Sequence, residues 1–189
     1  MGMPAITERH WTPDDVWALP ADGKRYECID GVLLVSPSPP PAHQIAHREL
    51  TKRLFEWLSS IGGFDRFITA PADIRYAPDV LVQPDLGITR LPFTVRTGFP
   101  TADALCVAIE ILSPSTARHD RGIKRRFYQR AGVPEYWIVD VDARVIERWR
   151  PADERPEVLA DTLRWTDPVT TTTCTLDVAA LFRDVWDEP

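Results

Sequence analysis

The spacing of hydrophobic and polar residues along the chain predicts helices and strands in mixed order. From residue 42 to 60 apolar residues recur at helical spacing, and one broad face carries Ala46, Leu50, Leu54, Trp57, Leu58 and Ile61. Residues 104–112 are nearly all apolar, which is the pattern of a strand buried on both faces. Residues 119–131 follow a helical period again, and 135–140 form another apolar strand. This strand–helix–strand order implies a crossover connection, so we expect an α/β (α+β mixed) fold with a partly parallel sheet.

Capping and turn residues predict the shorter elements. Thr12 and Pro13 suit the start of a helix that stops before Pro20. Asp30-Gly31 stands between two β-prone runs and predicts a hairpin of residues 24–29 and 32–35. The remaining predicted elements are short strands within 64–89, a loop over 90–101, a strand over 145–149, a strand near Val158 and a helix over 177–182.

The composition is that of a globular protein. Hydrophobic residues make up 44% and charged residues 26% of the 189 residues, which excludes the disordered and fibrous classes. No apolar run approaches the roughly 20 residues that span a bilayer, and the first residues lack the apolar core of a secretory signal. We expect a cytoplasmic protein, not bound to membranes, with a single domain over 1–189. Its predicted parts are an N-terminal helical segment (1–22), a core (23–150) and a C-terminal strand and helix extension (151–189).

The three cysteines show no sign of a disulfide or a zinc site. Cys28, Cys106 and Cys174 are far apart, odd in number, and none forms a CxxC pair. Because free cysteines are among the most buried residue types, we expect all three in the core.

Two acidic residues are predicted to meet at one end of the sheet. Asp85 follows a strand-like run, and Glu110 lies in the next strong strand. Neighbouring strands are about 4.8 Å apart, and two converging carboxylates bind a hard divalent cation such as Mg²⁺. Such a cation polarises a phosphate and lowers the pKa of bound water. The structural alternatives are a Pro-Asp turn for Asp85 and a salt bridge for Glu110, with Lys124 as a candidate partner.

The helix over 119–131 adds cations to an otherwise acidic protein. The net charge is −6, yet between 118 and 130 one acid, Asp120, stands among Arg118, Arg121, Lys124, Arg125, Arg126 and Arg130. Arginine guanidinium groups fork onto phosphates, so Arg118, Arg121, Arg125 and Arg126 are candidates for contact with a nucleic-acid backbone; a solvated helix face is the alternative. Lys124 and Asp120 lie four residues apart on one side of this helix. Lys124 could therefore stabilise phosphate charge at the strand end, whereas Asp120 either takes part in catalysis or merely pairs with Lys124.

Six stretches in a fixed order resemble one known family. They are YECIDG (26–31), His43, QPD (83–85), AIEILSPST (108–116), Asp120 with Lys124 and Tyr128, and GVPEYWIVD (132–140). The sequence resembles the Uma2 family of endonucleases in the PD-(D/E)xK restriction-endonuclease-like superfamily. The resemblance implies a restriction-endonuclease-like core, here 23–150, with a mixed central β-sheet flanked by helices. It also implies Mg²⁺ or Mn²⁺ at Asp85, Glu110 and the main-chain carbonyl of Ile111.

The resemblance also assigns roles to further residues and contains one departure. Two residues after the acid the parent motif has a lysine, where this chain has Leu112. Family members supply the lysine from the following helix, which here is Lys124. Glu27 would be a third acid near the metal, the alternative being an exposed strand glutamate. His43 would touch phosphate or water, the alternative being an exposed residue or a helix cap, and Tyr128 is expected to pack in the core.

These observations lead to two hypotheses. The first is a Mg²⁺-dependent endodeoxyribonuclease that hydrolyses phosphodiester bonds in DNA, with catalytic residues Asp85, Glu110, Lys124, Glu27 and His43. The second is a catalytically inactive restriction-like fold that binds nucleic acid or protein, which Leu112 and the acidic total charge favour. A homodimer would supply two sites for two strands. Trp137 and Trp149 are candidate interface anchors, although burial in the core is the more common role of such residues.

Overall fold

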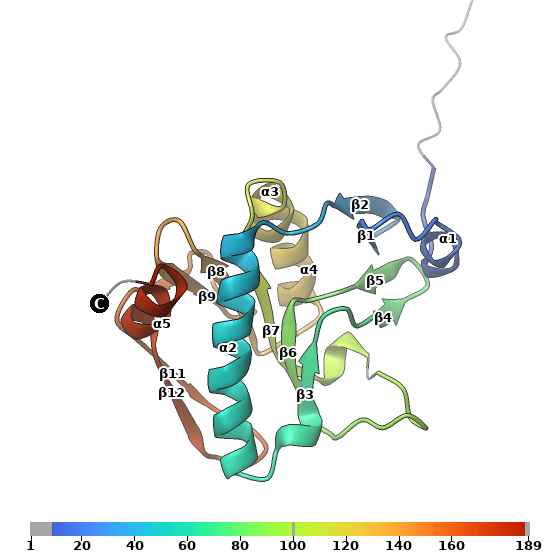
Figure 1. Ribbon diagram of the computed structural model, residues 1–189. Helices are drawn as coiled ribbons and strands as arrows, with labels where there is room; N and C mark the ends of the chain where they lie inside the picture. Colours follow the sequence, from blue (N-terminus) through green and yellow to red (C-terminus); the bar gives the residue numbers. More distant parts are fainter. Residues whose placement is uncertain (1–8, 100, 188–189) are drawn as a thin grey trace, which may run out of the picture.

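A six-stranded mixed sheet runs through the centre of the computed structural model, which describes residues 9–99 and 101–187 (Figure 1). Its strand order is β10-β9-β8-β7-β6-β3. The strands are β3 (Phe67–Thr69), β6 (Leu86–Thr89), β7 (Leu105–Ile111), β8 (Glu135–Asp140), β9 (Val145–Trp149) and β10 (Glu157–Leu159). Only the central pair β7 and β8 is parallel among these described strands, because their connection crosses over through the helical segment between them. The expected mixed sheet flanked by helices is confirmed.

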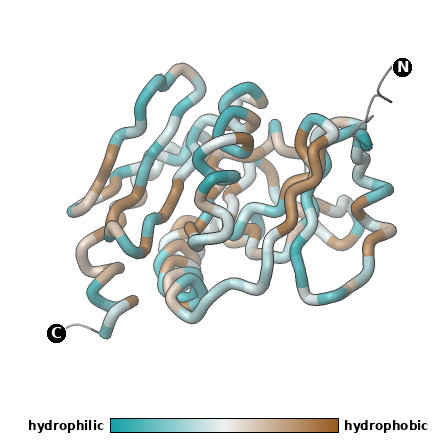
Figure 2. Tube along the Cα trace, turned by 90° about the horizontal axis from the view of Figure 1, so that it is seen from above, coloured by the Kyte–Doolittle hydropathy of each residue, from teal (hydrophilic) through white to brown (hydrophobic). Residues whose placement is uncertain are grey.

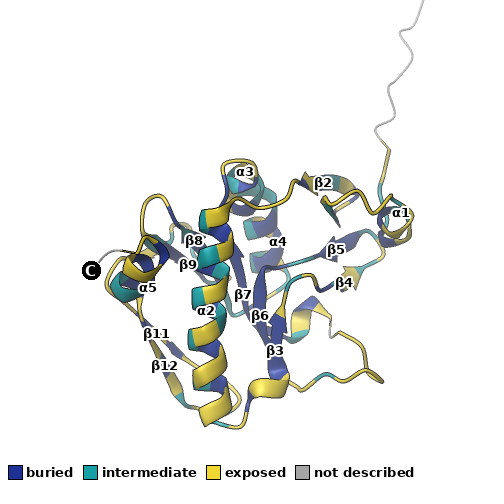
Figure 3. Cartoon of the chain, viewed as in Figure 1, coloured by how far each residue is buried: buried dark blue, intermediate teal, exposed yellow. Residues whose placement is uncertain are grey.

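Helices cover both faces of this sheet. The long helix α2 (Pro41–Ser60) lies across one face, and α3 (Ala117–His119), a π-helical turn (Asp120–Lys124) and α4 (Arg125–Arg130) lie across the other. Figure 3 shows the inner side of α2 buried and its outer side exposed. The predicted apolar face of α2 is confirmed, with Ala46, Leu50, Leu54 and Leu58 fully buried. Trp57 and Ile61 pack only at its margin.

From Val107 onward, successive residues of β7 alternate between these two layers. Val107, Ile109 and Ile111 face the cluster that contains α2, whereas Ala108 lies in the cluster that contains α4. Both sides of the strand are therefore apolar, as the unbroken hydrophobic run predicted. Figure 2 shows hydrophobic stretches along the inner strands and hydrophilic stretches along the outer turns. Glu110 shares the α4 side with Ala108, which directs a carboxylate into the interior.

A second sheet stands beside the first and carries the N-terminal part of the chain. Its order is β2-β1-β5-β4, with β1 (Arg25–Ile29), β2 (Val32–Ser36), β4 (Ile74–Ala77) and β5 (Val80–Val82). The predicted hairpin turns at Asp30 and Gly31, whose φ angles of 53° and 76° suit an Asp-Gly pair. The short helix α1 (Pro13–Trp17) packs on β1 and starts with the predicted cap, in which Thr12 and Asp15 bond reciprocally.

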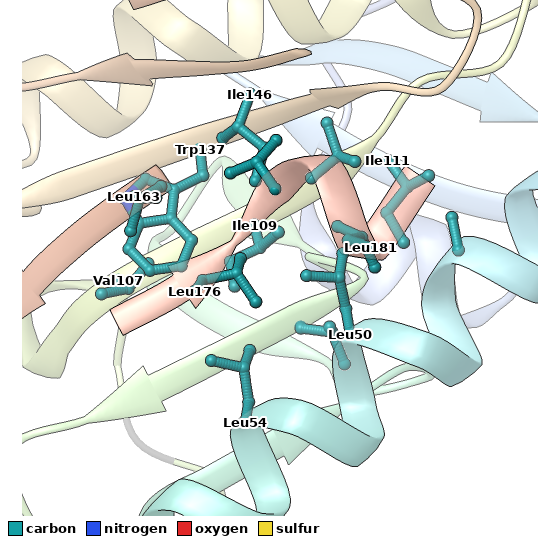
Figure 4. Packing of buried hydrophobic residues seen from close by; sticks show 14 of the residues in the cluster. Leu50, Leu54, Val107, Ile109, Ile111, Trp137, Ile146, Leu163, Leu176 and Leu181 are labelled. Carbon is teal, nitrogen blue, oxygen red and sulfur yellow. The ribbon is translucent and has the colours of Figure 1, made fainter. Parts of the chain in front are cut away.

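The C-terminal part forms a hairpin and a helix that the sequence only partly indicated. The strand near Val158 is β10, and the predicted helix is α5 (Val178–Val185). The hairpin of β11 (Thr162–Thr166) and β12 (Thr173–Asp177) was not predicted. Each of its strands points only two apolar residues inward, a weak signal, yet Figure 4 shows Leu163 and Leu176 packed against Trp137 and α2.

All three cysteines are free and buried, as expected. Trp137 and Trp149 are buried in the core, so neither is exposed as an interface anchor in this chain. Over the described ranges, no helix has both the length and the apolar character needed to cross a membrane. Residues 1–8 of the N-terminal segment, Pro100 of the predicted loop and residues 188–189 of the C-terminal extension lie outside the described residues.

Candidate active site

Three carboxylates surround one buried lysine, and a fourth lies beside them and pairs with Arg25. Glu27 comes from β1, Glu110 from β7 and Asp120 from the π-helical turn, while Asp85 directly precedes β6. None of the four residues is more than 2% exposed. The antiparallel register pairs Leu86 with Ile109, which places Asp85 beside Glu110 at one strand end, as expected from the strand spacing. The alternative of an exposed strand glutamate is wrong for Glu27, which is 0% exposed.

Lys124 supplies the central positive charge of this cluster. Its Nζ lies 2.7 Å from Glu27 Oε2, 2.9 Å from Glu110 Oε1 and 3.6 Å from Asp120 Oδ1. Burial would lower the pKa of Lys124, but the charges of Glu110 and Glu27 outweigh it and raise that pKa, so the side chain is an ammonium. The predicted helix is interrupted here by the π-helical turn, a feature frequent at functional sites.

Asp85 is held ionised by donors on both of its oxygens. Oδ1 accepts a hydrogen bond from Arg25 Nη1 at 2.7 Å, and Oδ2 accepts one from the main-chain N–H of Ile111 at 2.8 Å. Nε2 of His43 lies 3.1 Å from Oδ2, and His43 is buried, which contradicts the alternative of an exposed helix-start histidine. Although burial acts to raise the pKa of Asp85, the hydrogen bond to His43 and the charge of Arg25 hold that pKa well below its usual range.

Arg25 is the functional candidate that the sequence analysis missed. Besides its bond to Asp85, its guanidinium approaches Glu110 Oε2 and Glu27 Oε2, each at 3.9 Å. Arg25 therefore touches three of the four acids. A strand places residues i and i+2 on one face, so the two-residue separation of Arg25 and Glu27 in a predicted strand was the signal that could have found it.

The cluster carries an excess of negative charge. Four carboxylates face two permanent cations, Arg25 and Lys124, so full ionisation of the acids would leave two negative charges in a buried space. Burial accordingly raises the pKa of Glu110 well above its usual range and also raises that of Asp120. Within the described residues, no three His, Cys, Asp or Glu side chains are already arranged as metal ligands. The oxygen-only donor set and the excess charge nevertheless fit a hard divalent cation at Asp85 and Glu110, which keeps most of its own waters.

A cavity opens beside this cluster. Its volume is about 470 Å³, a size typical of pockets for small ligands. The walls include Trp17, Tyr26 and Pro71, and the polar groups that line it include Arg25, His43 and Asp85. The cavity therefore gives a substrate access to Arg25 and Asp85, whereas Lys124 and Glu110 lie behind them and do not line it.

Comparison with known proteins identifies the family. A family model described as "Uma2: Putative restriction endonuclease" matches residues 13–179. The chain belongs to the Uma2 family. Among solved structures, the "crystal structure of a putative nuclease belonging to DUF820 from Anabaena variabilis ATCC 29413" has a TM-score of 0.74 at 20% sequence identity. That match covers 93% of this chain and 99% of the other, so the two share a fold. Among curated proteins, no relative matches.

The stretches that resemble Uma2 proteins surround the acid cluster. YECIDG forms β1 and its turn, QPD precedes β6, and AIEIL runs through β7. At the position where the parent motif has a lysine, Leu112 packs with the apolar residues on the α4 side. Lys124 instead brings its ammonium to Glu110 from the π-helical turn. Tyr128 packs in the core against Phe127 and Tyr136, as expected.

The arginines of the basic helix of this Uma2 protein have different environments. Arg118 and Arg126 are exposed. Arg121 pairs with Asp140 at 2.6 Å and Glu147 at 2.5 Å, and Arg125 stacks over the ring of Trp149 at 4.6 Å. No contact of Arg121 or Arg125 with the acid cluster is seen in the described part of the chain, so two of the four candidates are held by other partners.

Asp120→Asn is expected to stabilise the folded protein by about 1 kcal/mol at pH 8 without metal. Neither carboxylate oxygen of Asp120 has a hydrogen bond of normal geometry, and burial raises its pKa even though Lys124, at 3.6 Å, and Thr116 act to lower it. A raised pKa means that the charged form opposes folding above the ordinary value of 3.8, so the gain should vanish as pH falls below it. Thermal unfolding in EDTA would measure this as about 2–4 °C.

A second buried aspartate provides the control for this variant. Asp167 is as buried as Asp120, but its bond with Arg66 at 2.5 Å holds its pKa below the usual range. Asp167→Asn should therefore destabilise the protein at pH 8. A loss of stability in Asp120→Asn as large as that in Asp167→Asn would contradict the excess of negative charge around Lys124.

Proposed function

We propose that this protein is a divalent-metal-dependent endonuclease that hydrolyses phosphodiester bonds in DNA. The observation that carries the proposal is the buried cluster in which Asp85 and Glu110 adjoin at neighbouring strand ends with Lys124 bonded to Glu110. An acid pair that can hold a divalent cation, next to an ammonium, suits phosphodiester hydrolysis. Membership of the Uma2 family and a fold shared with a structure titled "a putative nuclease" support the same reaction class.

Each residue of the cluster has a distinct proposed role. Asp85 and Glu110, with the main-chain carbonyl of Ile111, would hold Mg²⁺ or Mn²⁺. When bound, such a cation polarises the phosphate and activates water. Lys124 would stabilise negative charge that develops on the phosphate. Glu27 fixes the Lys124 ammonium at 2.7 Å, and His43 fixes the Asp85 carboxylate.

The proposed substrate contacts extend over the neighbouring surface. Arg118 and Arg126 are exposed and would bind the DNA backbone, with weaker contributions from Arg121 and Arg125, which have partners of their own. Two copies acting as a homodimer would cut both strands, and the protein would work in the cytoplasm. The inactive binding module remains the second candidate, because Leu112 replaces the motif lysine and Lys124 is already fully paired.

The test is a calorimetric titration of Mn²⁺ into the wild type and Asp85→Asn, followed by incubation with supercoiled DNA. The substitution replaces the carboxylate of a proposed metal ligand by a neutral amide. Mn²⁺ binding should therefore weaken by about tenfold or more, and cleavage should fall with it. Asp30→Asn is the matched control, since Asp30 pairs with Arg130 on the surface and should change neither result. DNA binding without metal-dependent cleavage, unaffected by Asp85→Asn, would favour the binding module.

A further inference from the structure

Arg25 stands between the acid cluster and the cavity. Its guanidinium bonds to Asp85 at 2.7 Å and approaches Glu27 and Glu110, while its side chain remains 20% exposed and lines the cavity. The other cation of the cluster, Lys124, is 1% exposed and does not line the cavity. Of these two cations, Arg25 alone has access to both the carboxylates and the space that a substrate would enter.

The hydrogen bonds of Asp85 place Arg25 where a metal ion would have to bind. Oδ2 already receives the Ile111 N–H and lies against His43, both of which are fixed by secondary structure. Oδ1 has Arg25 as its partner, on a side chain that can rotate toward the cavity. A cation between Asp85 and Glu110 would therefore meet the guanidinium, which lies against both carboxylates and carries the same sign of charge.

We propose that Arg25 and the divalent cation are alternative partners of Asp85 and Glu110, and that metal binding releases the Arg25 guanidinium into the cavity to bind the substrate phosphate. This inference rests on the proposed function. Without metal, Arg25 compensates part of the buried negative charge. With metal, that charge is compensated by the cation, and the freed guanidinium presents its fork of donors to a phosphate. Metal and substrate phosphate would thus be taken up together.

The test compares Mn²⁺ affinity and cleavage in Arg25→Gln and the wild type. Removal of the competing cation should tighten Mn²⁺ binding on the order of tenfold, while cleavage at saturating Mn²⁺ should fall on the order of tenfold because the phosphate ligand is lost. Added Mn²⁺ should also raise the Tm of Arg25→Gln more than that of the wild type. A purely structural role would lower metal affinity and cleavage together.

Two further variants keep the test decisive. Lys24→Gln removes the adjacent positive charge, which pairs with Asp22 outside the cluster, and should leave Mn²⁺ affinity unchanged. Arg25→Lys retains the charge if Arg25→Gln folds poorly, and it should bind Mn²⁺ with an affinity between those of the wild type and Arg25→Gln.

The outcomes separate this inference from the proposed function. Suppose that Arg25→Gln binds Mn²⁺ no more tightly than the wild type, while Asp85→Asn still weakens binding. This result would overturn the proposed competition between Arg25 and the cation and would leave the proposed metal site intact. Equal tightening in Lys24→Gln would overturn it too, since any nearby charge would then suffice. Mn²⁺ binding unaffected by Asp85→Asn would overturn both proposals.

Discussion

Glu110→Gln should reduce DNA cleavage by on the order of 10²–10³-fold and at the same time raise the Tm of the metal-free protein. The substitution keeps the shape of the side chain and removes a carboxylate that the proposed cation needs. It also lowers the excess of acids over cations in the cluster by one, while Lys124 keeps Glu27 as a partner at 2.7 Å. Activity should therefore fall while stability rises, as expected where buried charges that destabilise the fold are needed for activity.

The pH dependence of this effect follows from the pKa of Glu110. Burial raises that pKa well above the ordinary value of 4.5, so the folded state binds a proton more tightly than the unfolded state does. The carboxylate consequently weakens folding progressively as pH rises above 4.5. Glu110→Gln should thus be more stable than the wild type at pH 8, and the two should converge below pH 4.5.

Glu49 provides a control because its pKa is shifted in the direction opposite to that of Glu110. It lies on α2 and pairs with Arg53 at 2.9 Å and with Arg48 at 3.2 Å. These two arginines lower the pKa of Glu49 although burial acts to raise it. Glu49→Gln should leave cleavage unchanged and should not raise Tm at pH 8. Cleavage rates at saturating Mn²⁺ and thermal unfolding in EDTA measure both quantities. Wild-type cleavage by Glu110→Gln would remove Glu110 from the proposed mechanism.

The framework of the fold could be predicted because its signals are local or strongly periodic. The apolar face of α2, the two-sided apolar run of β7 and the crossover to β8 all follow from spacing along the chain. The β11–β12 hairpin could not be predicted this way. Its strands have few inward apolar residues, such as Trp165 and Cys174, and these are buried by distant parts of the chain, among them α2, β8 and α5.

The site was predictable to the extent that strand geometry determines it. Asp85 and Glu110 adjoin because Asp85 directly precedes β6 and Glu110 lies near the end of the antiparallel neighbour β7; their positions in the sequence had indicated that they would meet. Two partners of Lys124, Glu110 and Asp120, were named from the sequence, whereas its shortest contact, with Glu27 at 2.7 Å, was not. The π-helical turn that carries Lys124 was not marked by any sequence pattern either. Arg25 was missed for another reason: its importance arises from contact with acids up to 85 residues away, although its spacing from Glu27 placed both on one face.

Lys124→Met should be the most destabilising substitution in the cluster, at about 3–5 kcal/mol at pH 8 without metal. Methionine fills a similar volume, so the effect isolates the charge. Its loss leaves Glu27, Glu110 and Asp120 without the ammonium that faces all three. The raised pKa of Lys124 keeps the wild-type side chain charged throughout the range from pH 5 to 9, so its own titration does not contribute there.

The dependence of this loss on pH and on Glu110 distinguishes charge from packing. Because the uncompensated acids become protonated as pH falls, Lys124→Met should lose less stability at pH 5 than at pH 8, measured by urea unfolding in EDTA. In the double variant with Glu110→Gln, one of those acids is already neutral, so the combined loss should be smaller than that of Lys124→Met alone. Lys52→Met, at an exposed position of α2, should change stability by less than about 0.5 kcal/mol.

A pH-independent loss that Glu110→Gln does not relieve would show that Lys124 stabilises the fold through packing of its side chain, and the ammonium would then have no special role among the carboxylates.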